Sequence, residues 1–179
     1  MSVLVVAATA AEAAYVPKGL PVVLTGIGKT AAAATLARAL AQSPGVSEVV
    51  NIGTAGALRD GLSGLHLPGQ VLNHEISAGA LRALGHDPME WLTIPGGTDT
   101  VLASGDVFVT DEAVRSRLAR DAHLIDMEGY AVAWTCAAFG VPVRLVKHVS
   151  DNADEASMQW PQLVDRSARV LGEWLAESL

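Results

Sequence analysis

The 179-residue sequence predicts an α/β fold, a single-domain three-layer sandwich with helices on both faces of a mostly parallel or mixed central sheet. Short β-branched segments alternate with longer Ala- and Leu-rich segments along the chain. Half of the residues are hydrophobic but only 4% are aromatic, a composition typical of parallel strands packed closely under helices. No repeat, low-complexity tract or long linker divides the chain, so we expect residues 1–179 to form one domain.

The first third of the chain predicts three strands and one helix. Short β-branched runs indicate strands at residues 3–8, 22–25 and 46–52. An Ala- and Leu-rich segment, residues 29–41, is typical of a helix and ends at a Ser-Pro-Gly sequence. The second and third strands each lead into small residues that we interpret as turns, residues 26–28 and 53–56.

The middle of the chain is less regular than its ends. Short strands are expected at 71–73 and 92–94, with a weak helix between them, and a further strand at 101–103. Asp111 is expected to cap a helix that ends near residue 120. The C-terminal part then predicts strands at 123–126 and 143–149, and helices at 127–139 and 158–178.

Glycines and acidic residues gather where these predicted strands end. They comprise Glu12 and the segments 26–28, 53–56, 104–106, 126–128 and 150–151. Because ligands of such sheets bind beyond the carboxyl ends of the strands, we expect one small-molecule site at this edge.

Charge and residue usage exclude several classes of partner. The net charge is −7 and the basic residues are scattered, whereas nucleic-acid binding needs a basic face. No apolar run reaches the roughly 18 residues that cross a membrane, and the N-terminus lacks the basic start of a signal peptide. The single cysteine, Cys136, excludes an intramolecular disulfide, and the histidines show no metal-ligand spacing. We therefore expect a cytoplasmic protein without a metal or other cofactor.

The segment 25–30 allows two nucleotide-binding interpretations and one structural interpretation. A Walker A loop would end in the same Gly-Lys-Thr, but its first glycine would fall at Val23, inside a strand. A dinucleotide-binding turn would need an acidic residue where Asn51 stands. The third interpretation is a tight strand-to-helix turn that binds nothing.

The acidic segments also have structural interpretations. Asp126 and Glu128 flank Met127 at a helix start, where carboxylates are often only caps. The same pair could instead accept hydrogen bonds from sugar hydroxyls while the thioether packs on the ring. Asp151 similarly could be a helix cap or a proton donor, and Glu12 could be a solvated side chain.

Five sequence blocks, taken in order, resemble the nucleoside phosphorylase/nucleosidase superfamily, most closely its 5′-methylthioadenosine/S-adenosylhomocysteine nucleosidases. The blocks are 26–29, 51–56, 104–108, 126–129 and 150–154. Each block alone is a weak signal, but five in the same order are specific. The resemblance implies a compact version of the phosphorylase/nucleosidase fold.

The resemblance also implies an activity, hydrolysis of the N-glycosidic bond of a purine nucleoside, with adenine the expected base. Glu12 matches the glutamate that activates the attacking water, and Asp151 the aspartate that protonates N7 of the leaving purine. Such proton transfers are needed because a purine leaves poorly as an anion.

The remaining matches imply contacts with the substrate. Glu128 matches the carboxylate that binds the ribose hydroxyls, and Met127 the residue packed on the sugar. Phe108 matches the aromatic side chain stacked on the base, and the backbone of Val109 would read the base edge. The resemblance places Thr54, Gly56 and Ser150 in the same site.

Hydrolysis is favoured over phosphorolysis because phosphate binding needs fixed cationic donors. Phosphorolytic members carry an arginine where this chain has Asn51, and an arginine-bearing loop where this chain reads 7–12. Two alternatives stay open, a purine nucleoside phosphorylase and a relative that binds a nucleoside or base without cleaving it.

The chain departs from the family pattern in three places. The material between Glu12 and Gly26 is short, which could displace Glu12, and residues 57–100 match poorly. Lys147 stands where relatives tend to have an arginine that orients the catalytic aspartate. Since the family forms symmetric assemblies, we expect a homodimer.

Overall fold

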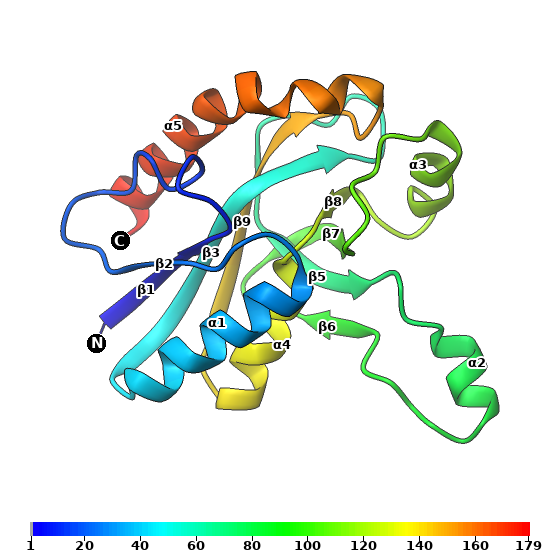
Figure 1. The fold of residues 1–179 in the computed structure, drawn as a ribbon, viewed down its shortest axis with the longest axis horizontal. Helices are drawn as coiled ribbons and strands as arrows, with labels where there is room; N and C mark the ends of the chain where they lie inside the picture. Colours follow the sequence, from blue (N-terminus) through cyan, green and yellow to red (C-terminus); the bar gives the residue numbers. More distant parts are fainter. Residues whose placement is uncertain (1) are drawn as a thin grey trace.

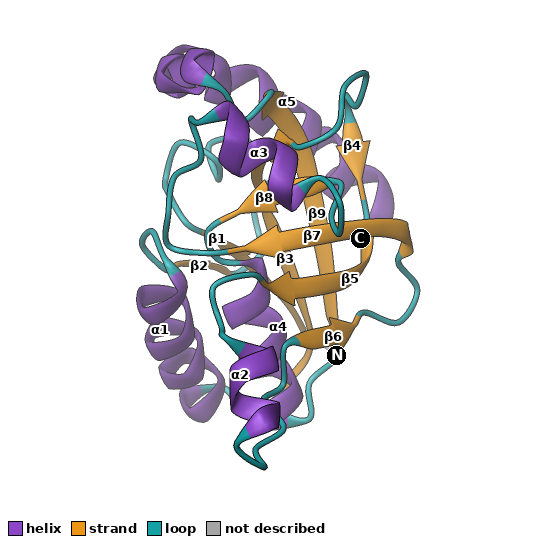
Figure 2. Ribbon diagram, turned by 90° about the vertical axis from the view of Figure 1, so that its right-hand side faces the viewer, coloured by secondary structure: helices purple, strands orange, loops and turns teal. Residues whose placement is uncertain are grey.

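The computed structural model describes residues 2–179 and confirms the predicted α/β class. Within these residues, nine strands form one mixed sheet between layers of helix (Figures 1 and 2). The strands are β1 Ser2–Ala7, β2 Val22–Leu24, β3 Val46–Ala57, β4 Leu65–His66, β5 Pro68–Asn73, β6 Trp91–Thr93, β7 Thr98–Ser104, β8 Leu124–Asp126 and β9 Val143–Asp151. The α-helices are α1 Lys29–Gln42, α2 Ala78–Ala83, α3 Glu112–Leu118, α4 Gly129–Phe139 and α5 Trp160–Ser178, and a 3-10 turn, η1 Glu155–Gln159, precedes α5.

The long strand β3 organises the sheet. The strand order is β2-β1-β3-β8-β7-β5-β6, while β9 lies along β3 and also pairs with β4. β3 is parallel to β1 and β9, and β5, β7 and β8 are parallel in turn. The pairs β3–β8, β4–β9 and β5–β6 are antiparallel. β1 and β9 therefore run in the same direction as β3, whereas β8 and β7 run in the opposite direction, so their carboxyl ends approach the middle of β3 from the other side.

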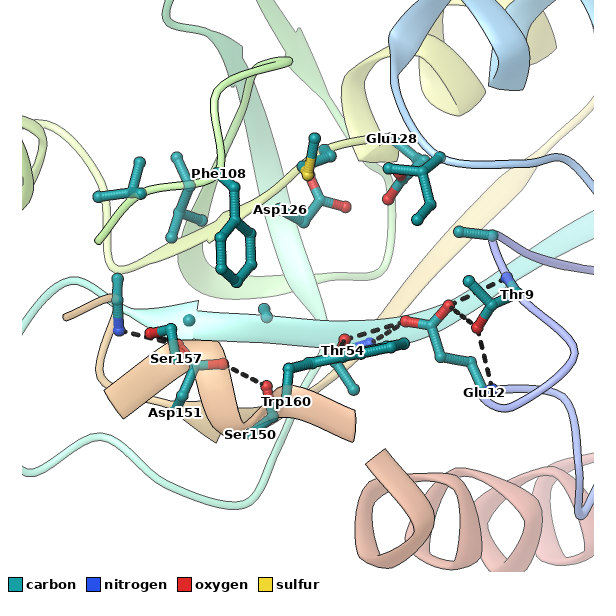
Figure 3. A pocket seen from close by; sticks show the side chains of 18 of the residues that line it. Thr9, Glu12, Thr54, Phe108, Asp126, Glu128, Ser150, Asp151, Ser157 and Trp160 are labelled. Carbon is teal, nitrogen blue, oxygen red and sulfur yellow. Dashed lines mark hydrogen bonds between the residues drawn. The ribbon is translucent and has the colours of Figure 1, made fainter. Parts of the chain in front are cut away.

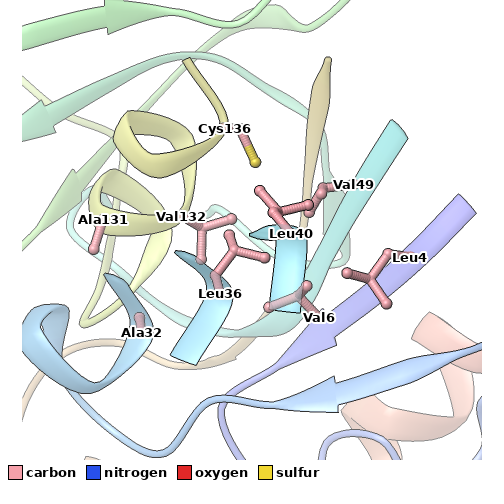
Figure 4. Close-up of a cluster of buried hydrophobic side chains, with 9 residues drawn as sticks. All are labelled: Leu4, Val6, Ala32, Leu36, Leu40, Val49, Ala131, Val132 and Cys136. Atoms are coloured by element: carbon pink, nitrogen blue, oxygen red, sulfur yellow. The ribbon is translucent and has the colours of Figure 1, made fainter. Parts of the chain in front are cut away.

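Alternating side chains of the strands fill two separate cores, as strand geometry requires. Leu4 and Val6 of β1 pack against α1 and α4, in a cluster that includes Leu36 and Val132 (Figure 4). On the opposite face, Val5 belongs to the cluster beneath α5. Figure 1 shows α5 on one side of β3 and β9, and α1 with α4 on the other. The predicted three layers are thus confirmed.

The structure corrects the prediction of a turn at residues 53–56. β3 continues through these small residues to Ala57, because β9 pairs with it from Val49 to Gly56. The small size of Gly56 is needed in the strand, since a Cβ there would lie 2.9 Å from the Cβ of Ala153. Tertiary pairing has therefore overridden a local signal that is typical of a turn.

Other differences concern the limits of elements. β5 and β7 are longer than predicted, and the short β4 was not predicted. The predicted helices 127–139 and 158–178 begin two residues later, at Gly129 and Trp160. In the part of the chain that the structure describes, no helix is both long and apolar enough to cross a membrane.

Docking of α5 on the sheet can be tested at Leu171, which is fully buried among strand residues. Leu171→Ala is expected to lower the free energy of unfolding by about 2–5 kcal/mol, because it removes buried methyl groups and leaves a cavity. The exposed Glu177→Ala, on the same helix, serves as the control and should change it by less than about 0.5 kcal/mol. Urea denaturation measures both, and equal effects would contradict the packing described here.

Candidate active site

All nine residues that the sequence analysis assigned to the site line one cavity of about 320 Å³. The cavity lies beside β3 and beyond the carboxyl ends of β1, β7, β8 and β9, and its wall comes from segments that are distant in the sequence (Figure 3). The nine residues are Glu12, Thr54, Gly56, Phe108, Val109, Met127, Glu128, Ser150 and Asp151.

Glu12 is held by two threonines. Its Oε1 accepts hydrogen bonds from the backbone N–H of Thr54 at 2.9 Å and from the Thr54 hydroxyl at 3.0 Å. Its Oε2 accepts from the Thr9 hydroxyl at 3.0 Å and the Thr9 N–H at 3.2 Å. Glu12 is only 5% exposed, so the short segment that follows it has not displaced it from the cavity.

A local motif explains this placement. The Glu12 N–H donates back to the Thr9 hydroxyl at 3.2 Å, which completes the reciprocal bonds of a capping box. The Thr-x-x-Glu spacing of residues 9–12 carries the signal, although the sequence analysis did not use it. Glu12 is thus oriented by its own turn on one side and by β3 on the other.

Asp151 ends β9 and is surrounded by donors. Its Oδ1 accepts from the Ser157 hydroxyl at 2.6 Å and from the Ala153 N–H at 2.9 Å, and its Oδ2 accepts from the Ser150 hydroxyl at 2.6 Å. Ala153 adopts a positive φ of 51°, which turns the chain back over the carboxylate. Ser157 was not predicted as a site residue.

Glu128 lies on the opposite side of the cavity from Glu12 and Asp151 (Figure 3). Its Oε1 accepts from the backbone N–H of Gly28 at 2.8 Å. Burial and, to a smaller extent, the negative charge of Asp126 raise the pKa of Glu128 from its ordinary value of 4.5 to about 7. The turn 26–28 therefore contributes to the site by donating a backbone hydrogen bond to Glu128.

Asp126 lines the cavity and makes three contacts within the protein. It accepts from the Ser104 hydroxyl at 2.5 Å and from the Gly129 N–H at 2.9 Å. Its Oδ2 also lies 2.9 Å from the ammonium of Lys147. Asp126 also lines the cavity, so its joint binding of a sugar with Glu128 stays a prediction.

Lys147 forms its ion pair with Asp126 and not with Asp151, the aspartate that the resemblance implies it would orient. It pairs with Asp126 and is 1% exposed. Burial lowers the pKa of Lys147, but the charges of Asp126, Glu128 and Glu12 outweigh it, so the pKa is raised overall. The ammonium thus offsets the negative charge of three carboxyl groups that line the cavity, whereas Asp151 is held by hydroxyls and a backbone N–H.

The loop after β7 brings Phe108 and Val109 to the cavity. Glu75 fixes this loop, because its Oε1 accepts from the N–H groups of Asp106 at 2.9 Å and Val107 at 3.1 Å. The other oxygen of Glu75 pairs with the ammonium of Lys29 at 2.5 Å. Lys29 is therefore committed to an ion pair, which argues against the Walker A interpretation of segment 25–30.

Trp160 was not predicted as a site residue, and its indole Nε1–H donates to the Thr54 hydroxyl at 2.8 Å. No local pattern marks this tryptophan, because its role depends on how α5 docks. Among residues 2–179, no group of three or more His, Cys, Asp or Glu side chains has a geometry that could hold a metal ion.

The fold and this cavity define an α/β protein with three carboxyl groups, those of Glu12, Glu128 and Asp151, in one cavity beside the long strand β3. The family model of the Phosphorylase superfamily matches residues 7–176. The chain therefore belongs to the Phosphorylase superfamily, as the five blocks predicted.

Individual relatives agree with this assignment. The chain is 38% identical over 78 residues to an aminodeoxyfutalosine nucleosidase of Helicobacter pylori, an alignment that spans 42% of this chain and 34% of that relative. It is 30% identical to a 5′-methylthioadenosine/S-adenosylhomocysteine nucleosidase of Staphylococcus carnosus, over 87% of this chain and 79% of the relative. The first alignment covers only about a third of the relative's length.

Solved structures show the same fold. The 5′-methylthioadenosine/S-adenosylhomocysteine nucleosidase from Helicobacter pylori with butyl-thio-DADMe-Immucillin-A matches with a TM-score of 0.86 at 23% identity, over 99% of this chain and 97% of that one. The Streptococcus pneumoniae MTA/SAH nucleosidase in complex with 8-aminoadenine matches with a TM-score of 0.80 at 22% identity, over 98% and 99%.

The raised pKa of Glu128 predicts a pH-dependent stability. Because the folded-state pKa is about 7 against an ordinary 4.5, protonated Glu128 favours the folded state. That contribution is complete below pH 4.5 and is lost as the pH rises through 7. The wild-type free energy of unfolding should therefore fall relative to Glu128→Gln by on the order of 2–3 kcal/mol between pH 5 and 8.

Urea denaturation of both proteins at several pH values measures this difference. Parallel curves for the wild type and Glu128→Gln would contradict the buried environment of the carboxyl group.

Proposed function

We propose that this chain hydrolyses the N-glycosidic bond of a purine nucleoside and releases the free base and a ribose derivative. The observation that carries the proposal is the convergence of Glu12, Glu128 and Asp151 on one cavity. These are the acidic side chains that acid–base cleavage of a glycosidic bond requires.

The arrangement supports a division of roles among the three carboxyl groups. Asp151 delivers a proton to N7 of the purine, so that the base leaves as a neutral molecule. Bond breaking leaves an oxocarbenium-like sugar, whose positive charge the ionised form of Glu128 stabilises. Glu12, on the other side of the cavity, takes a proton from the water that adds to the anomeric carbon.

The remaining lining residues support binding of the base and the sugar. Phe108 is 46% exposed at the cavity, which leaves its ring available to stack on a purine. Val109 offers its backbone to the base edge, and Met127 offers a thioether to the apolar face of the ribose. Thr54, Gly56 and Ser150 complete the wall near the sugar and the attacking water.

Water is proposed as the nucleophile because the cavity offers no clamp for phosphate. No arginine or lysine is among the described residues that line it. Asn51, at the position of the phosphorolytic arginine, is buried and donates to the carbonyl of Val6 at 3.2 Å. Glu12, which lines the cavity, supports water as the nucleophile because its carboxylate can accept a proton from it.

The names of the relatives support the choice of substrate. They are nucleosidases for methylthioadenosine, S-adenosylhomocysteine and aminodeoxyfutalosine. We propose methylthioadenosine or S-adenosylhomocysteine as the substrate, with adenine as the base.

The proposal includes a cytoplasmic homodimer. Ile27 and Val107, which line the cavity, are 61% and 56% exposed, and a partner subunit would bury such apolar side chains. Light scattering at several protein concentrations tests the dimer, and a monomer mass throughout would contradict it.

Hydrolysis is tested by incubating the protein with methylthioadenosine, S-adenosylhomocysteine and inosine in phosphate-free buffer. Free base is expected from the adenine nucleosides. Asp151→Asn and Glu12→Gln are each expected to lower kcat by about 10²–10⁴-fold, because each removes one proton-transfer group. Chromatography of the released base measures the rate.

Glu177→Ala, on the exposed face of α5, is the control and should retain the wild-type rate. Base release only after phosphate is added would identify a phosphorylase. Adenine binding without release of base from any of the nucleosides would identify a binding protein.

A further inference from the structure

The junction between η1 and α5 contacts Asp151 directly and reaches Glu12, the other residue that the proposed function makes catalytic, through Thr54. From η1, the Ser157 hydroxyl donates to Asp151. From the first residue of α5, the Trp160 indole donates to Thr54, which in turn donates to Glu12. Figure 3 shows Trp160 lying between the Asp151 side of the cavity and Glu12. The resemblance that supports the proposed function assigns no role to Trp160.

The hydrogen-bonding capacity of each group fixes the direction of this chain of contacts. An indole N–H can only donate, so the Thr54 hydroxyl must accept from Trp160 at 2.8 Å. A hydroxyl has one proton, and Thr54 therefore directs it to Oε1 of Glu12 at 3.0 Å. Without the indole N–H, the Thr54 hydroxyl could rotate and use its proton elsewhere.

The other oxygen of Glu12 has an equivalent arrangement. The Thr9 hydroxyl accepts from the Glu12 N–H and so directs its own proton to Oε2. Each carboxylate oxygen thus receives one backbone N–H and one oriented hydroxyl. Thr9 is oriented locally by the capping box, whereas Thr54 depends on Trp160 from the far end of the chain.

The position of the indole is set by the helix that carries it. Pro161 lies in the first turn of α5, where its fixed φ suits the start of a helix. Leu171 and Leu175 of the same helix are fully buried beneath the sheet. Catalytic groups must be held within about 0.5 Å of their working geometry. Because α5 is packed on the sheet, it can hold the indole of Trp160 in a fixed position.

We propose that Trp160 is a positioning residue for Glu12, acting through the orientation of the Thr54 hydroxyl. The inference rests on the proposed function, because it concerns the group that activates water. It makes hydrolysis, but not binding of the base, dependent on a single indole N–H.

The test is Trp160→Phe, which keeps an aromatic ring and removes the N–H. The kcat for base release should fall by about tenfold, in line with the loss of one oriented hydrogen bond. KM and the calorimetric dissociation constant for adenine should stay within about twofold, because Phe108 and Val109 bind the base independently of Glu12. Trp134→Phe, at an exposed tryptophan of α4 outside the cavity, is the matched control and should retain the wild-type kcat.

A double-mutant cycle identifies the route of the effect. Thr54→Val breaks the same link at its middle, so adding Trp160→Phe to Thr54→Val should cause little further loss of kcat. If Trp160→Phe does not fold, Thr54→Val alone must still lower kcat while adenine binding is retained.

Three results would overturn the inference and leave the proposed function intact. They are an unchanged kcat in Trp160→Phe, fully multiplicative losses in the double variant, and a loss of adenine affinity parallel to the loss of kcat. A wild-type protein that releases no base would overturn the proposed function and the inference together.

Discussion

The structure depends on one buried cation, the ammonium of Lys147. Asp126, Glu128 and Glu12 all act on it as negative charges, although they come from different segments of the chain. Removing an ionised group from water costs several kcal/mol, so carboxylates gathered in this way need a neutralising partner. β9 supplies that partner because it lies directly beside β3. Gly53 of β3 makes room for it, since a Cβ there would lie 3.3 Å from the ammonium and 3.2 Å from Oε1 of Glu12.

The short N-terminal segment is compatible with the site because it docks on α5. A Cβ on Gly172 would lie 2.4 Å from the carbonyl oxygen of Tyr15, so only a glycine permits this close approach. The Tyr15 hydroxyl donates to Asp165 at 2.8 Å, and the Arg169 guanidinium lies 4.4 Å from the centre of the Tyr15 ring. These contacts hold the residues that follow Glu12 against the helix that also carries Trp160. The turn that contains Glu12 is therefore held by β3 through Thr54 and by α5 through Tyr15.

Most helices and strands, and the residues that line the cavity, could be predicted from the sequence because the signals for them are local. The β-branched runs that became β1 and β9 and the Ala-rich segment that became α1 each report their own conformation. The position of the site beyond strand ends followed from the acidic and small residues that come after the predicted strands. The candidate residues do lie beyond the ends of β1, β7, β8 and β9, but the antiparallel pairing of β3 with β8 brings these ends together from opposite directions.

What the sequence did not predict depends on tertiary contacts. Residues 53–56 have the composition of a turn, and only pairing with β9 makes them a strand. The ion pair of Lys147 with Asp126 and the hydrogen bond of Trp160 to Thr54 depend on which segments meet across the sheet and beneath α5. Such contacts cannot be predicted from a local sequence pattern. The resemblance did not predict the partner of Lys147 either, because relatives tend to have an arginine at that position.

The bond between Glu128 and the Gly28 N–H has a consequence for which sugars the cavity would accept. That bond engages Oε1, which leaves Oε2 to face the sugar. A ribose would present a hydroxyl to this oxygen, whereas a 2′-deoxyribose would leave a buried carboxylate without that donor. Sites of this kind reject an analogue through an unsatisfied polar group rather than through a steric clash. Under the proposed function, discrimination between ribonucleosides and deoxyribonucleosides would therefore originate in a glycine turn whose sequence first suggested phosphate binding.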